Sequence, residues 1–136
     1  MKVSLFCCAA GSVVDKLSGK LSIFNLITDV GANSLPLFFP KIAIVGVIHR
    51  ESADADKSDI LLVGSINEEN LFSHKVKVEF NSSRTNLLTV NINGLKIDMP
   101  GFVKVNMVYN DKIISTCTFA VDLIGNSSTT PTVFVG

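Results

Sequence analysis

An alternation of apolar and polar residues runs through almost the whole chain and constrains its fold more than any other feature. Residues 73–80 read SHKVKVEF, with Val76, Val78 and Phe80 separated by charged residues. This period of two predicts a half-buried β-strand, because successive side chains of a strand point to opposite faces. The same pattern recurs in the segments 3–9, 21–30, 41–50, 59–67, 87–92, 102–109 and 112–124, and no stretch has the spacing of an amphipathic helix.

Polar turns separate these segments. Asn110-Asp111 joins two of them as a tight hairpin, and Asn93-Gly94 can either turn the chain or bulge it. Short strands with turns at intervals of about 8–12 residues are typical of sandwiches and barrels. We predict an all-β, antiparallel β-sandwich of about eight strands, immunoglobulin-like or C2-like, over residues 1–125. Residues 126–136 form a C-terminal tail that can add an edge strand.

The chain opens with MKVSLFCCAAG, which resembles several kinds of signal. The apolar run from Leu5 to Ala10 is shorter than the core of a secretory signal. Phe6 stands where a lipoprotein signal has a small residue. Cys7 and Cys8 are adjacent, whereas a thioredoxin-like site needs Cys-x-x-Cys. We therefore interpret this segment as the first strand of the domain, with reduced thiols in a cytoplasmic protein.

In that strand, alternation places Val3, Leu5, Cys7 and Ala9 on one face. Cys117 lies in the last long strand. If the first and last strands are neighbours, we expect Cys117 to approach Cys7.

The composition excludes several classes of function. Lys+Arg and Asp+Glu are equal at 12 each, so no basic surface is expected for a nucleic-acid backbone. No uncharged apolar run approaches the roughly 20 residues that a membrane-spanning helix needs. The chain has no Trp and one Tyr, which argues against a stacking platform for bases. Because 47% of the residues are hydrophobic, the excess must pack inside the domain or against another subunit.

Catalytic motifs are absent from the sequence. A nucleophile elbow, Gly-x-Ser-x-Gly, does not occur, and neither does a glycine-rich phosphate loop. His49 and His74 are the only histidines, and zinc would need at least three ligands meeting at one point. We predict no enzymatic activity, no catalytic residue and no cofactor.

Residues 51–59, ESADADKSD, carry the densest group of carboxylates. C2-like sandwiches bind calcium through loop aspartates, so Asp54, Asp56 and Asp59 are the candidate metal ligands, and sugar binding by this loop is a related alternative. The order of an EF-hand fails, because Asp59 stands at its glycine position and Ser65 at its glutamate position. We interpret the segment as a solvated turn and predict no metal site.

Segment 41–48 is apolar on both faces, with Ile42, Ile44 and Ile48 opposite Ala43, Val45 and Val47. A two-layer sandwich covers only one face of a strand, so the outer set predicts a patch that a partner covers. The interface candidates are Val45, Val47 and, in the tail, Val133, Phe134 and Val135. The alternative is that loop 31–40, which carries Leu37, Phe38 and Phe39, folds over the outer face.

Four segments carry a family resemblance: MKVSLFCCA, GKLSIFNLITDV, a Pro-x-x-x-Pro leading into a hydrophobic strand, and PGFVKVNMVYNDKIISTCTFAV. Together they resemble a group of short bacterial proteins that are catalogued as a domain of unknown function. The likeness is least in residues 51–85 and does not extend past Gly125. It implies no catalytic residue.

These observations predict a non-enzymatic module that binds another protein or itself, as a homo-oligomer and most simply as a two-fold dimer. A structural subunit of a phage or secretion-type assembly is the alternative, since such subunits can add strands to their neighbours. We expect no nucleic-acid partner and no membrane partner.

Overall fold

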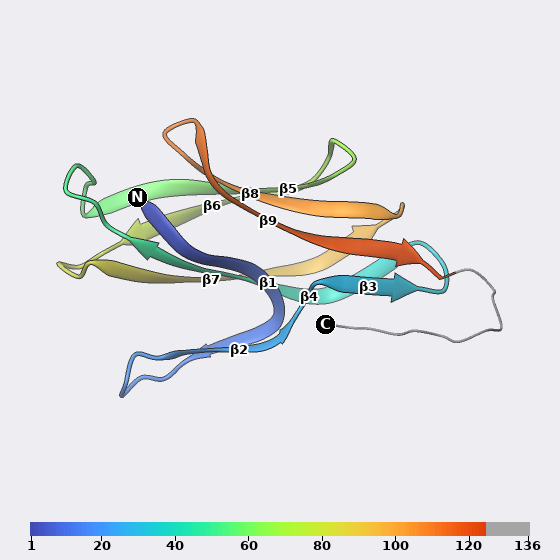
Figure 1. Ribbon diagram of the computed structural model, residues 1–136, viewed down its shortest axis with the longest axis horizontal. Helices are drawn as coiled ribbons and strands as arrows, with labels where there is room; N and C mark the ends of the chain where they lie inside the picture. Colours follow the sequence, from blue (N-terminus) through green and yellow to red (C-terminus); the bar gives the residue numbers. More distant parts are fainter. Residues whose placement is uncertain (125–136) are drawn as a thin grey trace.

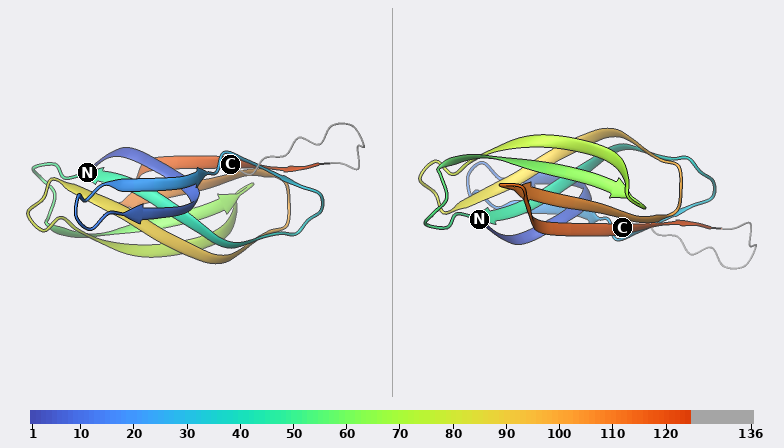
Figure 2. Two further views of the ribbon diagram at one scale, coloured as in Figure 1. Left: turned by 90° about the horizontal axis from the view of Figure 1, so that it is seen from below. Right: turned by 90° about the horizontal axis from the view of Figure 1, so that it is seen from above.

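The computed structural model describes residues 1–124, which form nine β-strands and no helix (Figure 1). Two sheets are stacked as layers, with strand order β2-β1-β4-β7 in sheet 1 and β3-β9-β8-β5-β6 in sheet 2 (Figure 2). The strands are β1 (Lys2–Val14), β2 (Leu21–Leu26), β3 (Asp29–Ala32), β4 (Leu37–His49), β5 (Lys57–Ile66), β6 (Glu69–Glu79), β7 (Thr85–Ile97), β8 (Gly101–Tyr109) and β9 (Lys112–Leu123). The predicted all-β class is confirmed, with nine strands where about eight were expected.

Two hairpins follow from their turn residues. Asn110 and Asp111 connect β8 to β9 with φ angles of 50° and 61°, and Asn67 and Glu68 connect β5 to β6 with φ angles of 48° and 70°. Two consecutive residues with positive φ make a turn whose twist matches that of the flanking strands. The hairpin predicted at Asn110-Asp111 is therefore confirmed.

Residues 21–30 were expected to form one strand, and this prediction is wrong. Asn25 adopts a left-handed φ of 53°, and the chain then crosses from sheet 1 to sheet 2. At the crossing, the Ile27 N–H donates to the Cys8 carbonyl and the Ala120 N–H donates to the Thr28 carbonyl, both at 2.9 Å. β3 then pairs with β9 in parallel, so the two sheets are not wholly antiparallel.

β4 begins earlier than the sequence suggested. Residues 37–39 pair with residues 95–97 of β7, so they belong to the sheet and do not fold over its outer face. The loop-cover alternative is therefore wrong. Pro40 lies inside β4, opposite Gly94 of β7, which has a φ of 73°. The residues on either side of Pro40, Phe39 and Lys41, pair with β7. β7 runs straight through Asn93-Gly94, and its register with β4 is the same before and after Gly94, so neither the expected turn nor the expected bulge occurs there.

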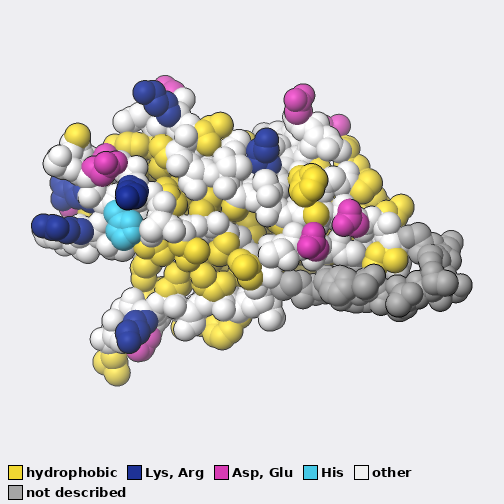
Figure 3. Space-filling model, viewed as in Figure 1, with side chains coloured by type: hydrophobic (Ala, Val, Ile, Leu, Met, Phe, Trp, Pro, Cys, Tyr) yellow, Lys and Arg dark blue, Asp and Glu magenta, His cyan; other side chains and the backbone are white. Residues whose placement is uncertain are grey.

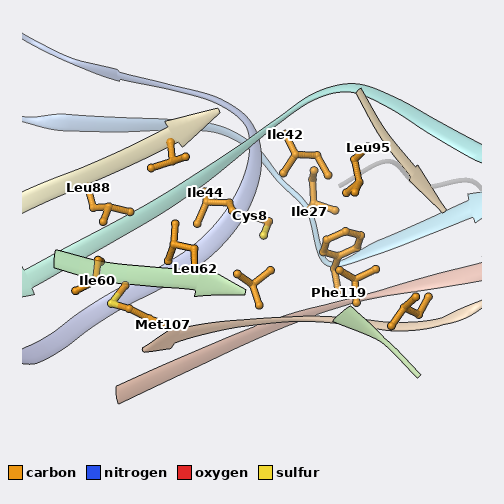
Figure 4. Close-up of a cluster of buried hydrophobic side chains, with 14 of the residues drawn as sticks. Cys8, Ile27, Ile42, Ile44, Ile60, Leu62, Leu88, Leu95, Met107 and Phe119 are labelled. Carbon is orange, nitrogen blue, oxygen red and sulfur yellow. The ribbon is translucent and has the colours of Figure 1, made fainter. Parts of the chain in front are cut away.

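Near the start of β1, an irregularity changes which side chains point into the core. The pairing of β1 with β4 shifts register between Val3 and Leu5, which takes Ser4 out of the ladder. One extra residue reverses the facing of every later side chain. Cys8 consequently points into the core and Cys7 does not, contrary to the expected grouping of Cys7 with Val3 (Figure 4).

The core lies between the two sheets and draws on all strands except β2 (Figure 4). The predicted inner face of the β8–β9 hairpin is confirmed: Val105, Met107, Phe119 and Val121 are at most 2% exposed. Phe119 meets Phe39 of β4 edge-to-face, with ring centroids 6.0 Å apart. Within residues 1–124, no buried side-chain nitrogen or oxygen atom lacks a hydrogen-bond partner.

Candidate functional site

The acidic loop before β5 surrounds the amino group of Met1. Asp54 accepts an ion-paired hydrogen bond from this ammonium at 2.7 Å, and Glu51 accepts one at 2.9 Å. The Glu51 N–H also donates to Asp54 at 2.8 Å, and the Tyr109 hydroxyl donates from β8 at 3.5 Å. Asp54 is the one buried charged side chain of residues 1–124. It therefore ties the start of sheet 1 to a loop and a strand of sheet 2.

These contacts set the protonation of the two groups. Burial alone raises the pKa of Asp54, but the Met1 ammonium and the Glu51 N–H favour the carboxylate and hold this pKa below its usual value. Burial also disfavours the Met1 ammonium, but the hydrogen bonds to Asp54 and Glu51 outweigh it and raise the pKa of the amine. Both groups stay charged near neutral pH.

The other two aspartates of the loop lie in different surroundings. Asp56 accepts hydrogen bonds from Arg50 at 3.5 Å and from the Ser82 N–H at 3.2 Å. Asp59 belongs to β5, where it is exposed and stands opposite Lys77 of β6 in the strand register. Over residues 1–124, no three His, Cys, Asp or Glu side chains converge in a way that could hold a metal ion. The loop is therefore built around cations of the chain itself.

Within residues 1–124, neither histidine forms a hydrogen bond or an ion pair with a thiol or a carboxylate. The His49 ring contacts the Thr85 hydroxyl at 3.1 Å and the Ser4 hydroxyl at 2.8 Å. His74 is exposed on β6. A polar depression of about 470 Å³ lies beside the acidic loop and is lined by Arg50, Glu51, Ser52, Ser82, Ser83 and Arg84. Arg50 is bound to Asp56, and over residues 1–124 no serine hydroxyl of this depression forms a hydrogen bond with a histidine or a carboxylate.

The outer face of sheet 1 is apolar where β1 and β4 pair. Cys7, Val45 and Thr89 stand in register across β1, β4 and β7. Val45 has no exposed area in the single chain, and Val47 is half-buried. Of the two interface candidates in this strand, only Val47 is thus accessible. Val133, Phe134 and Val135 lie outside the described residues.

The β1–β2 hairpin extends this apolar face away from the body of the molecule (Figure 1). Figure 3 shows hydrophobic side chains gathered where the hairpin leaves the sandwich. Leu5, Val13, Phe24 and Leu26 are exposed there, at 38–54% of their area. Phe24 and Leu26 of β2 stand opposite Gly11 and Ala9 of β1. The four exposed side chains therefore lie on the same face of sheet 1 as Val45.

Sequence reasoning missed this part of the surface. The signal was present in LSIFNL, which is apolar on both faces of β2 (Leu21–Leu26) as segment 41–48 is. Among residues 1–124, β2 pairs only with β1, so it is an end strand of sheet 1. Its second edge carries backbone donors and acceptors that can pair with another strand.

The three thiols are free, and two of them meet between the sheets. Cys8 of β1 and Cys117 of β9 place their sulfur atoms 3.9 Å apart. The expected approach of Cys117 to Cys7 is therefore replaced by one to Cys8, because of the register shift in β1. The hydrogen bond with Cys8 lowers the pKa of Cys117, and the same bond together with burial raises the pKa of Cys8.

Comparison with known proteins adds a family and no activity. No helix in residues 1–124 is long and apolar enough to cross a membrane. A search of curated proteins found no match. A family model described as a family of unknown function, DUF6941, matches residues 2–122, including the middle segment where the resemblance was least apparent. The match runs from the first residue of β1 to within one residue of the end of β9, and the chain therefore belongs to the family of unknown function DUF6941.

Proposed function

We propose that this protein is a non-enzymatic, self-associating β-sandwich module of the cytoplasm. The observation that carries the proposal is the apolar outer face of the β1–β2 hairpin next to the edge of β2 that pairs with no strand of residues 1–124. Exposed apolar side chains that adjoin one another are unusual on a soluble monomer and mark an interaction surface. Free thiols are compatible with a reducing compartment.

We further propose an immunoglobulin-like arrangement for the sandwich. The sheet order β9-β8-β5-β6 matches G-F-C-C′ of a variable-type immunoglobulin sheet, and the neighbours β4 and β7 correspond to B and E. β1 then stands at the position of strand A, next to B, and β2 is the extra strand of this sheet. β2 supplies the edge of the proposed contact, which distinguishes this chain from the plain fold.

A second copy of the chain is the occupant that fits this surface. β2 has no charged residue, so two copies of β2 can approach edge to edge without burying an unpaired charge. Pairing about a two-fold axis continues sheet 1 into one sheet across both copies. Phe24 and Leu26 of each copy then extend the same apolar face.

The test is the molar mass in solution at tens of micromolar, measured by light scattering after size exclusion. We expect a dimer for the wild type and a monomer for Phe24→Lys, because the new charge is placed on the contact face. Phe102→Lys is the matched control: Phe102 is 68% exposed on β8 of the other sheet, and its variant should remain dimeric. Both variants should melt within a few degrees of the wild type, since neither side chain is buried.

Other results would overturn the proposal or replace its occupant. A monomeric wild type contradicts self-association. If a chain ending at Gly125 is monomeric while Phe24→Lys is still dimeric, the tail with Val133, Phe134 and Val135 makes the contact instead of β2. Open-ended assembly that survives Phe24→Lys supports the alternative of a structural subunit.

A further inference from the structure

Cys8 and Cys117 join the two layers of the sandwich at a place where no ladder hydrogen bonds link them. β1 belongs to sheet 1 and β9 to sheet 2, and the two cysteines are 109 positions apart in the sequence. Their sulfur atoms are 3.9 Å apart, and a disulfide bond needs about 2.05 Å. The two sulfur atoms together have to close a gap of about 1.9 Å to reach that length.

The surroundings give the two thiols different roles. Cys117 is partly exposed, so a small reagent can reach it from solvent, whereas Cys8 is 4% exposed. Either sulfur can donate the S–H of this contact, and the thiol that gives up its proton is then stabilised as a thiolate by the other. A thiolate is the nucleophilic form of cysteine. Cys117, as the accessible thiol, is therefore the attacking residue and Cys8 the resolving one.

We propose that Cys8 and Cys117 form an oxidation site at which a hydroperoxide is reduced and a disulfide is made between the two sheets. The Cys117 sulfur attacks the terminal oxygen of the hydroperoxide, the O–O bond breaks, and an alcohol leaves, or water when the oxidant is hydrogen peroxide. Cys117 is now a sulfenic acid. The Cys8 sulfur attacks the Cys117 sulfur, and the hydroxyl leaves as water with the Cys8 proton.

This reaction balances with one oxidant. Two thiols lose two electrons and two protons, and one hydroperoxide gains them as one alcohol and one water molecule. A thiol reductant returns the pair to its starting state by exchange. Cys7 takes no part, because it lies on the outer face of sheet 1, opposite to Cys8.

The disulfide should make the folded state more resistant to heat. It would close a loop of 109 positions, and long loops restrict the unfolded chain most. We expect the melting temperature to rise by about 5–10 °C on oxidation. The effect should disappear on reduction and should not depend on whether the protein is monomeric or dimeric.

The experiment treats the reduced full chain with stoichiometric hydrogen peroxide and measures intact mass, peptide linkage and melting temperature. The wild type should lose two hydrogen atoms, contain a Cys8–Cys117 peptide pair and melt higher. Cys7→Ser, the matched control, should behave in the same way. Cys8→Ala should form no bond within the chain, and its Cys117 should be captured by dimedone as a sulfenic acid.

Three results would overturn the proposal. These are a linkage through Cys7, a disulfide only between chains, and dimedone capture of Cys7 in place of Cys117. Cys117→Ala serves as a second variant: if it loses the same two hydrogen atoms as the wild type, Cys117 is not the site. Because each readout concerns a bond within one chain, failure of the self-association test leaves this inference unaffected.

Discussion

The β8–β9 hairpin and the β1–β4 pair both lie inside a sheet, yet they use their two faces differently. The hairpin buries Val103, Val105 and Met107 on one face and exposes polar residues such as Lys104 on the other. In β4, Ile44 and Val45 point to opposite faces, and both have no exposed area. The hairpin thus has one buried face, whereas β4 is buried on both faces at this point of the sheet.

The first prediction separates the two faces of the hairpin. Phe119→Ala should lower the free energy of unfolding by about 3–5 kcal/mol, because the ring fills the centre of the core and contacts Phe39. Phe102→Ala, in the partner strand but 68% exposed, should change it by about 0.5 kcal/mol or less. Urea denaturation of both variants measures the two values. Similar losses for both would contradict the assigned facing of this hairpin.

The second prediction tests whether the outer face of β4 contributes to stability. Val45→Ala should cost about 2 kcal/mol, since Val45 has no exposed area and stands between Cys7 and Thr89 in the strand register. Val47→Ala, on the same face but half-buried, should cost less than about 1 kcal/mol. Urea unfolding of the two variants measures both losses of stability. A neutral Val45→Ala would mean that the outer face is open.

Alternation and turn chemistry were enough to predict the hairpin. Val105, Met107, Phe119 and Val121 could be assigned to one face from spacing alone, because the pairing of β8 with β9 keeps its register from Gly101 to Met107. Asn110-Asp111 fixed the turn. Local pattern decides the structure wherever a short turn joins neighbours along the chain.

Sheet 1 could not be predicted in the same way, because its irregularities depend on distant parts of the chain. The shift between Val3 and Leu5 reverses the facing of the thiols, and nothing in MKVSLFCCA indicates it. The apolar run 21–30 continues past Leu26, although the chain changes sheet there to meet β9. Asp54 was predicted to be solvated but is buried. Its partner, the Met1 amine, lies 53 positions away in the sequence, so no local pattern could indicate the contact.

The third prediction concerns the contact between β1 and β9 that connects the two regions. Cys117→Ala should cost about 1–2 kcal/mol, through lost packing against the core and the loss of the sulfur contact with Cys8. Thr118→Ala, the exposed neighbour, is the control and should be close to neutral. Both proteins should be measured under reducing conditions. An unchanged midpoint for Cys117→Ala would place its side chain at the surface.

The fourth and smallest effect is a pH dependence that arises where Asp54 joins the two sheets. The folded state lowers the pKa of Asp54 from its usual 3.8, so its contribution is present above pH 4 and is lost as acid protonates the carboxylate. The folded state raises the pKa of the Met1 amine from 8.0, so this contribution is present below pH 8 and is lost as the amine deprotonates at higher pH. The pair should therefore add a plateau of stability between about pH 4 and 8.

Asp54→Asn should flatten both flanks of the stability profile, and acetylation of the Met1 amine should remove the alkaline flank. Glu51→Gln, whose side chain is largely in solvent, should weaken the alkaline flank without abolishing it. Urea unfolding at intervals of one pH unit measures the profile, and an alkaline decline that persists in both Asp54→Asn and the acetylated protein would assign it to other groups.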